Sequence, residues 1–165
     1  MSTGITAVCP GSFDPITEGH LNIIRRASNM FQRVIVVVMT NTVKSPSFSV
    51  EERMEMIRKT TADIPNVEVD AYGGLLADYT RLKGAKAIIK GLRAMSDFEY
   101  EFQMALTNKK LNPDVETVFL TTSAEYMYLS SSMVKLIGSM YGDIKDFVPA
   151  VIHEDIKKRL SGKDA

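Results

Sequence analysis

The stretch Ile5–Thr40 reads ITAVCPGSFDPITEGHLNIIRRASNMFQRVIVVVMT and contains one complete strand–helix–strand unit. Apolar Ile5–Pro10 predicts a strand, and the helical spacing of the apolar residues that follow predicts a helix over Thr17–Phe31. Arg33–Thr40 is apolar and β-branched almost throughout, which is typical of a strand covered on both faces. The corner between the first strand and the helix, Cys9–His20, carries more prolines, glycines, hydroxyls and charge than a plain connection needs.

The same alternation of strands and helices continues along the chain. Further strands are predicted at Val67–Tyr72, Lys86–Lys90 and Glu116–Leu120. Further helices are predicted from Ser49 to about Thr61, at Leu75–Leu82, from Ser96 to about Lys110, at Ser130–Tyr141 and at Ala150–Leu160, with capping boxes at Ser49–Glu52 and Ser96–Glu99. This pattern predicts a single α/β domain over residues 1–165, built on a doubly wound, five-stranded parallel sheet. Ligands of such sheets bind beyond the carboxyl ends of the strands.

Composition and spacing exclude several classes of function. Lys plus Arg and Asp plus Glu both number 20, so no overall positive charge favours nucleic acid or an anionic membrane. Cys9 is the only cysteine, which rules out an intramolecular disulfide and favours a reducing compartment, so the cytoplasm is expected. The longest apolar run, Val34–Met39, is too short to span a bilayer, and no signal peptide is apparent. Zinc-site spacings, a nucleophilic serine elbow and the common Gly-rich phosphate loops are all absent.

The residues that follow the first strand are suited to binding an anion. Gly11 allows the backbone to approach a ligand closely, and Ser12 offers a hydroxyl beside its own N–H. Thr17 is placed to cap the helix, whose N-terminus carries partial positive charge and unpaired N–H donors. His20, one turn into the helix, is placed to donate a ring N–H to the same anion. The alternative interpretation is an ordinary turn and cap with a surface histidine.

Three later corners carry similar residues. Lys44 lies in the loop after the second strand, Lys90–Arg93 (KGLR) places two cations around Gly91 after the fourth, and Ser130–Ser132 supplies three hydroxyls at a predicted helix start. Arginine offers phosphate a bidentate fork, and glycine exposes its backbone N–H. Each corner also has a simpler explanation: a solvated lysine, a charge pair near a helix cap, and redundant capping. Four such features at one end of one sheet together predict a phosphate site.

These residues resemble those of a known superfamily. PGSFDP followed by the T-x-G-H helix start Thr17–His20 is similar to the phosphate-binding motif of the nucleotidylyltransferases. Phe48–Arg53 (FSVEER), Lys90–Arg93, Asp97–Glu101 (DFEYE) and Ser130–Lys135 (SSSMVK) extend the resemblance over nearly the full length, towards the bacterial branch whose acceptor is 4′-phosphopantetheine. The resemblance implies a Rossmann-like nucleotidylyltransferase fold. It also implies transfer of the adenylyl group of Mg-ATP to 4′-phosphopantetheine, giving dephospho-coenzyme A and pyrophosphate in coenzyme A biosynthesis.

The resemblance implies roles for particular residues as well. Those matched to the reacting centre are Ser12, His20, Lys44 and Arg93. Those matched to ATP contacts are Ser12, Phe13, His20, Gly91, Leu92, Arg93, Glu101, Tyr126, Met127, Tyr128, Leu129, Ser130, Ser131 and Ser132. Those matched to acceptor contacts are Ser12, Lys44, Leu76 and Lys90. Cationic and hydroxyl side chains suit this reaction, because the attacking group is already a phosphate anion and the transfer needs positioning and charge stabilisation more than a strong base.

The metal ion and the assembly also follow from the resemblance. Mg²⁺ is expected to be held mainly by the ATP phosphates, since the sequence offers no acidic cluster to build a protein metal site. The resemblance implies a homohexamer made of two trimers, and it leaves open feedback by the end product coenzyme A.

Two residues depart from the family pattern, and two other functions stay open. Glu18 stands where Asn is common and would repel phosphate if it pointed inward; Lys90 stands where Arg is common and lacks the bidentate fork. One alternative function is the same chemistry on a different acceptor, as in nicotinate mononucleotide adenylyltransferases or cytidylyltransferases. The other is an inactive module that binds coenzyme A or an adenine nucleotide.

Overall fold

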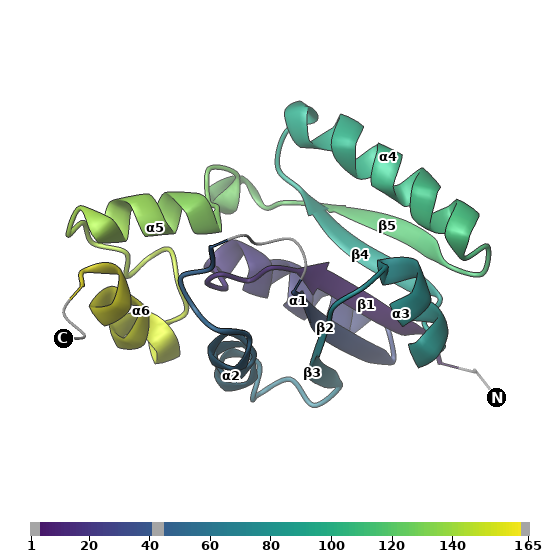
Figure 1. The fold of residues 1–165 in the computed structure, drawn as a ribbon, viewed down its shortest axis with the longest axis horizontal. Helices are drawn as coiled ribbons and strands as arrows, with labels where there is room; N and C mark the ends of the chain where they lie inside the picture. Colours follow the sequence, from purple (N-terminus) through teal and green to yellow (C-terminus); the bar gives the residue numbers. More distant parts are fainter. Residues whose placement is uncertain (1–3, 41–44, 163–165) are drawn as a thin grey trace.

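The sheet consists of five parallel strands in the order β3-β2-β1-β4-β5 (Figure 1). The computed structural model describes residues 4–40 and 45–162. The strands are β1 (Thr6–Gly11), β2 (Arg33–Met39), β3 (Val67–Tyr72), β4 (Ala87–Leu92) and β5 (Glu116–Thr121). From β1 the chain adds β2 and β3 on one side and then β4 and β5 on the other. The β1–β4 pair is therefore the switch point at which doubly wound sheets bind ligands. The predicted α/β class with a doubly wound, five-stranded parallel sheet is confirmed.

Helices cover both faces of this sheet. The long helices are α1 (Glu18–Met30), α2 (Val50–Thr60), α3 (Leu76–Lys83), α4 (Met95–Leu111), α5 (Ser131–Ser139) and α6 (His153–Leu160), with 3₁₀ turns at Ala124–Tyr126 and Ala150–Ile152. In Figure 1, α1 and α2 lie on one side of the sheet, α3 and α4 on the other, and α5 and α6 extend beyond it at the left. None of the described helices is long and apolar enough to cross a membrane.

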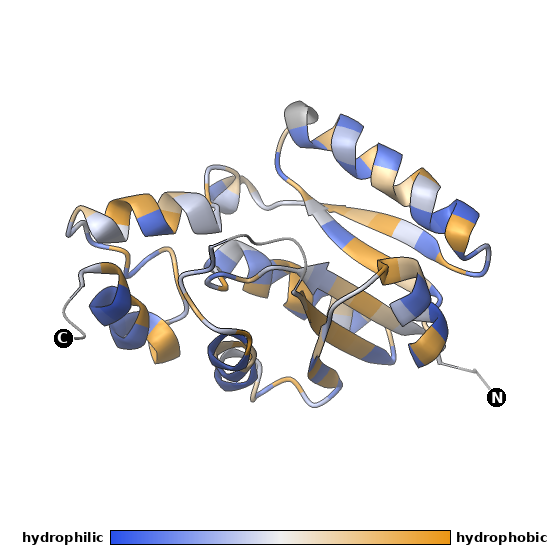
Figure 2. Cartoon of the chain, viewed as in Figure 1, coloured by the Kyte–Doolittle hydropathy of each residue, from blue (hydrophilic) through white to orange (hydrophobic). Residues whose placement is uncertain are grey.

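Strand β2 carries apolar residues on both faces, as the sequence predicts. Val34, Val36 and Val38 pack with α1 and α2 in the larger core cluster, whereas Ile35 and Val37 pack on the opposite face with α3. In Figure 2 this part of the sheet is coloured mostly as hydrophobic.

One of the two predicted capping boxes is correct. Ser49 accepts the Glu52 N–H at 3.1 Å, and the Glu52 carboxylate accepts the Ser49 N–H at 2.8 Å. The box predicted at Ser96–Glu99 is wrong, because the chain enters α4 directly after β4. Ala94 is the N-cap residue without a side-chain cap, and the Asp97 N–H already donates to its carbonyl at 3.1 Å. Residue 96 therefore stands inside the first turn, where it cannot be an N-cap.

The carboxyl ends of β1 and β4 separate. These strands are aligned at Ala7 and Val8 only, whereas β1 and β2 stay aligned along the whole of β1. The Lys86 N–H donates to the Thr6 carbonyl, and alternate residues of a parallel strand bond to the same neighbour, so position 10 faces β4. Pro10 has no N–H to donate there, and the ladder stops before it. The gap that results leaves room for a ligand.

Candidate active site

A pocket of about 380 Å³ opens between the separated ends of β1 and β4. Its walls come from the loop after β1, the first turns of α1, the end of β4, the start of α4 and the segment before α5. The sequence-predicted site residues that line it are Ser12, Phe13, His20, Lys90, Gly91, Arg93, Glu101, Tyr126, Leu129, Ser130 and Ser131. The fold therefore brings the corners after β1, β4 and β5 to one cavity.

Helix α1 begins with a capping box in which a histidine takes the place usually held by glutamate or glutamine. The Thr17 hydroxyl accepts the His20 backbone N–H at 3.3 Å, and the His20 Nδ1 accepts the Thr17 backbone N–H at 3.0 Å. Because Nδ1 is an acceptor, the proton of the neutral ring lies on Nε2. The cap thus leaves an Nε2–H donor for a ligand in the pocket.

The neutral form of His20 is favoured. Burial, and then the nearby charges of Arg93 and Lys90, lower the pKa of the imidazole from 6.5 to about 4. A second proton would have to sit on Nδ1, directly against the Thr17 N–H. At neutral pH the side chain is therefore a neutral hydrogen-bond donor and has no free lone pair on Nε2 with which to act as a base.

The loop between β1 and α1 turns sharply at Phe13. Its φ of 48° lies in the left-handed region, which is rare for a bulky side chain and costs free energy. The Phe13 ring meets the His20 ring edge-on, with 5.1 Å between centroids. A Cβ at position 11 would come within 3.0 Å of the Phe13 ring, so Gly11 leaves room for this ring beside the strand end.

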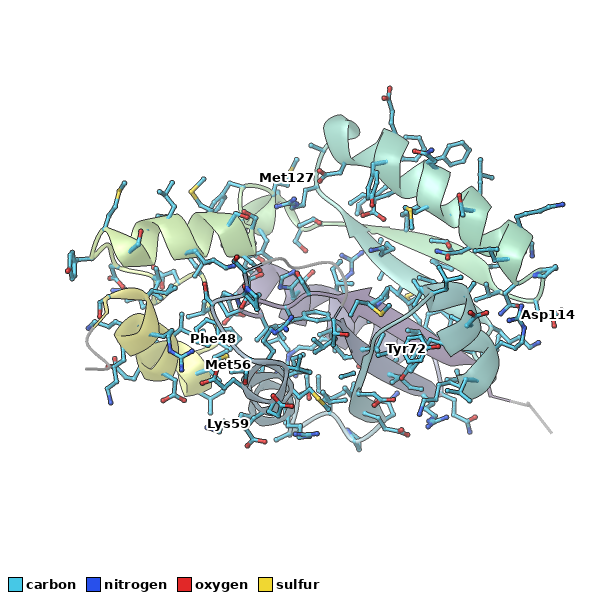
Figure 3. All side chains as sticks on the ribbon, in the orientation of Figure 1. Phe48, Met56, Lys59, Tyr72, Asp114 and Met127 are labelled. Atoms are coloured by element: carbon cyan, nitrogen blue, oxygen red, sulfur yellow. The ribbon has the colours of Figure 1, made fainter. Side chains whose placement is uncertain are left out.

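This turn is anchored from behind by distant segments. The Asp14 carboxylate accepts the Phe48 N–H at 2.9 Å and the Ser47 N–H at 3.0 Å. The Ser131 hydroxyl donates to the Pro15 carbonyl at 2.7 Å. Phe48, labelled in Figure 3, is buried and carries the Arg159 guanidinium 5.1 Å from its ring centroid. These contacts fix the corner in a conformation that its own sequence would not hold.

Both cations of the KGLR segment are paired with carboxylates of α4. The Lys90 Nζ lies 3.5 Å from Glu101 Oε2, and the Arg93 Nε lies 3.4 Å from Asp97 Oδ2. Arg93 Nη1 also donates to the Leu129 carbonyl at 3.0 Å. Lys90 and Arg93 are the only cations, and Asp97 and Glu101 the only acidic groups, among the described residues that line the pocket. The side chains of this described lining therefore carry no net charge.

Some predicted site residues lie elsewhere. Those that the structure places outside the pocket lining are Leu76, Leu92, Met127, Tyr128 and Ser132. Leu76 is the first residue of α3 and packs on the core cluster that contains Tyr79. Met127, at the junction between β5 and α5 in Figure 3, is exposed, as is Tyr128. Lys44 falls outside the described residues.

The serine triplet combines capping with a place at the pocket. Ser130 caps α5 by accepting the Met133 N–H at 3.1 Å, so the simpler explanation offered for this segment also holds. Ser130 and Ser131 nevertheless both line the pocket, because the residues that fix the start of α5 stand at the pocket wall.

Sequence reasoning missed several residues of the pocket. Asp97 was placed in a capping box, although its spacing of one helical turn from Glu101 and its position four residues after Arg93 are signals of an ion-pair partner. Ile23 fills the space left by Gly91, whose Cβ would lie 3.0 Å from the Ile23 side chain. Cys9 forms part of the lining, and burial raises the pKa of its thiol to about 12, so it remains a neutral group.

Comparison with known proteins identifies the family. A family profile described as cytidylyltransferase-like matches residues 8–137. The chain is 57% identical over 157 residues to the phosphopantetheine adenylyltransferase of Clostridium tetani, covering 95% of this chain and 98% of that protein. It is 56% identical over 154 residues to the enzyme of the same name from Caldanaerobacter subterraneus subsp. tengcongensis, covering 93% and 96% of the two chains. The chain belongs to the phosphopantetheine adenylyltransferase family.

Solved structures show that the fold extends beyond this family. A putative nicotinate-nucleotide adenylyltransferase from Vibrio parahaemolyticus superposes with a TM-score of 0.66 at 15% identity, over 94% of this chain and 93% of that chain. A nicotinic acid mononucleotide adenylyltransferase from Plasmodium falciparum superposes with a TM-score of 0.68 at 16% identity, over 96% and 98%. Identities this low carry the fold alone.

The two departures from the family pattern have different positions. Glu18 does not line the pocket. Its N–H donates to the Phe147 carbonyl at 2.9 Å, and burial raises the pKa of its carboxyl, with Arg25 opposing that rise. A carboxylate outside the pocket wall suits the helix N-terminus without facing the pocket. Lys90 does line the pocket and supplies a single ammonium, without the bidentate fork of an arginine.

Proposed function

We propose that this protein transfers the adenylyl group of Mg-ATP to 4′-phosphopantetheine, giving dephospho-coenzyme A and pyrophosphate. The observation that carries the proposal is the His20 Nε2–H, fixed by the Thr17 cap at the N-terminus of α1 in a pocket shared with Ser12, Lys90 and Arg93. The names of relatives at more than half identity support this choice of substrates.

The residues present suit an in-line displacement. An oxygen of the 4′-phosphate attacks the α-phosphorus of ATP, the bond to the β-phosphate oxygen breaks, and pyrophosphate leaves with the electron pair. The attacking phosphate is already anionic, so no base is needed. We assign the His20 Nε2–H to an α-phosphate oxygen, where charge builds in the transition state, and Ser12 to the same phosphates.

The remaining predicted contacts divide between the two substrates. We assign Arg93 to the ATP phosphates, and Lys44 with Lys90 to the acceptor phosphate. Lys90 and Arg93 are paired with Glu101 and Asp97, so phosphate would replace or share these carboxylate partners. Phe13, Gly91, Glu101 and the segment before α5 remain assigned to the nucleotide, and Leu76 to the pantetheine arm.

We place Mg²⁺ on the ATP phosphates, as part of the substrate. Mg²⁺ prefers hard oxygen ligands and keeps several waters, which phosphate oxygens permit. Within the described ranges, no group of three or more His, Cys, Asp or Glu side chains is arranged to hold a metal ion. The reaction is placed in the cytoplasm, where ATP is plentiful and the free thiol of Cys9 stays reduced.

A homohexamer made of two trimers is proposed as the working assembly. Helix α4 supports self-association, because Tyr100, Phe102 and Leu106 expose large apolar surfaces on it. Sedimentation velocity at micromolar concentration tests this proposal: a discrete hexamer is expected, and a monomer would contradict it. Coenzyme A is proposed as a feedback ligand, since it contains the pantetheine and adenine parts of both substrates; competition by coenzyme A against ATP binding tests it.

The acceptor is tested by measuring pyrophosphate release from Mg-ATP with a panel of acceptors. Among these acceptors, only 4′-phosphopantetheine is expected to give pyrophosphate release. Pantetheine without its phosphate should be inert because it lacks the nucleophile. Release with nicotinate mononucleotide would reassign the acceptor. Binding of ATP or coenzyme A without any release would instead indicate an inactive binding module.

A further inference from the structure

Arg53 is a buried arginine with an unusual set of partners. It lies on the first turn of α2 and is 2% exposed. Its Nη1 donates to the Ser12 carbonyl at 2.9 Å, and its Nε donates to the Ser49 carbonyl at 3.3 Å. No carboxylate of the described residues forms an ion pair with it. Buried charges are normally paired, because desolvation of an unpaired ion is costly.

The acidic groups nearest to Arg53 along the chain and around the turn are engaged elsewhere. Glu52 is paired with Arg159. Hydrogen bonds from Arg159 and from the Ser49 N–H lower the pKa of the Glu52 carboxyl to about 2. Asp14 is paired with Lys135. The charge of Arg53 is therefore left without compensation immediately behind Ser12, which lines the pocket.

The pocket lining lacks the net positive charge that Arg53 could supply. Its described side chains carry no net charge, because Lys90 and Arg93 are offset by Glu101 and Asp97. A site for a polyphosphate nevertheless needs positive potential. Arg53 contacts the carbonyl of Ser12, which lines the pocket, and supplies a positive charge that forms no ion pair with a described carboxylate.

We infer that Arg53 is a positioning residue for the polyphosphate site, which holds the Ser12 peptide in place through its carbonyl and whose uncompensated charge attracts the bound anion. The neighbouring Phe13 is held in a left-handed conformation, so this peptide requires support from outside the loop. The ligand class is a polyphosphate, represented by Mg-ATP or by inorganic pyrophosphate. The inference rests on the proposed function only for the identity of that anion.

The test compares a ligand that has phosphates with one that has none. Calorimetry is done on Arg53→Met and wild type with Mg-ATP, Mg-pyrophosphate and adenosine. We expect Arg53→Met to weaken pyrophosphate and ATP binding at least about tenfold, because a poorly solvated charge acts strongly across a low-dielectric wall. Adenosine binding should stay within about twofold, a difference worth less than half a kcal/mol.

A purely structural role would give a different pattern. The melting temperature of the empty Arg53→Met protein should change little, because loss of two carbonyl contacts is offset by removal of an unpaired buried charge. The rise in melting temperature on adding pyrophosphate should shrink. A large fall in the melting temperature of the empty protein, with equal losses for adenosine and pyrophosphate, would overturn the inference, as would unchanged pyrophosphate affinity.

Arg53→Lys and Arg53→Gln form the matched pair if Arg53→Met does not fold. Both shorten the side chain and lose the guanidinium fork, and only the glutamine removes the charge. Arg53→Lys should keep most of the pyrophosphate affinity and Arg53→Gln should not; equal losses in both variants would overturn the inference. A chain that binds pyrophosphate through Arg53 but releases none from ATP would instead contradict the proposed function and leave this inference standing.

Discussion

The Asp14 carboxylate and the Lys135 ammonium form an ion pair that joins the turn after β1 to helix α5. The carboxylate is 2% exposed and also accepts the backbone N–H groups of Ser47 and Phe48. Three segments that are far apart in the sequence therefore meet on one buried side chain. A buried carboxylate is tolerable only when its charge is paired and its oxygens are hydrogen-bonded, and here both conditions hold.

Asp14→Asn should destabilise the fold strongly. The amide removes the ion pair and leaves the ammonium without its partner. Its single oxygen can accept only one of the two backbone N–H groups, so its NH2 group faces the other donor. Removing one partner of a buried pair costs about 3–5 kcal/mol of the free energy of unfolding. Urea unfolding of Asp14→Asn, Lys135→Met and the double variant measures this coupling. The double variant should be less unstable than the sum of the single changes, and strictly additive losses would show that the pair does not act as a unit.

The helix cap in the corner after β1 could be predicted from neighbouring residues in the sequence. The contacts of this corner with distant segments could not. Thr17 and His20 are three residues apart, so a cap and a first-turn histidine could be deduced from the sequence. The partners of Asp14 could not, because Ser47 and Lys135 lie 33 and 121 residues away from it. The sequence places Asp14 only within the corner Cys9–His20, whereas the structure shows that it anchors the turn.

The errors have the same origin. The serine at position 96 has the spacing of a capping box, but the tertiary path from β4 starts the helix earlier. Pro10 does lie near the end of β1, as predicted, but the sequence reading did not use its missing N–H, which lets β1 and β4 separate. Lys90–Arg93 was predicted to bind phosphate, with a charge pair near a helix cap as the alternative. The structure shows both cations paired, and their pairing with Asp97 and Glu101 depends on how α4 lies over β4 and β5.

Lys44→Ala should weaken binding of 4′-phosphopantetheine more than binding of ATP. The change removes one charge-assisted hydrogen bond to the acceptor phosphate, worth about 1.5–3 kcal/mol. Calorimetry with each substrate separately measures both losses. Lys59→Ala is a suitable control, because this lysine lies on α2, is paired with Asp155 and is outside the pocket. Equal losses for both substrates in Lys44→Ala would assign the lysine to the nucleotide side.

His20 should keep its neutral Nε2–H form from pH 7 down to about pH 5, because its pKa in the folded protein is about 4. Nitrogen-15 NMR of the two imidazoles distinguishes this form, with His153 as the internal reference, since the chain has two histidines. The unfolded chain binds the proton more readily, so the contribution of His20 to stability is complete above pH 6.5 and is lost as the pH falls towards 4. A ring that titrates near 6.5, or carries its proton on Nδ1, would contradict the capping geometry.

His20→Ala should leave the fold in place and reduce kcat by a factor of about 10²–10³, as removal of one preorganised oxyanion donor does. The ring lines the pocket, so its truncation opens no cavity in the core. The KM values should change less, because the hydrogen bond is strongest when charge builds on the α-phosphate.

His20→Asn separates this donor role from catalysis by a base. The asparagine side chain keeps an N–H donor but has a shorter reach, and it cannot take up a proton near neutral pH. Partial recovery of kcat relative to His20→Ala is therefore expected if His20 acts as a donor, whereas a base would show none. A kcat for His20→Ala above about a tenth of the wild-type value, against the hundredfold minimum expected for such a donor, would remove His20 from the centre of the mechanism.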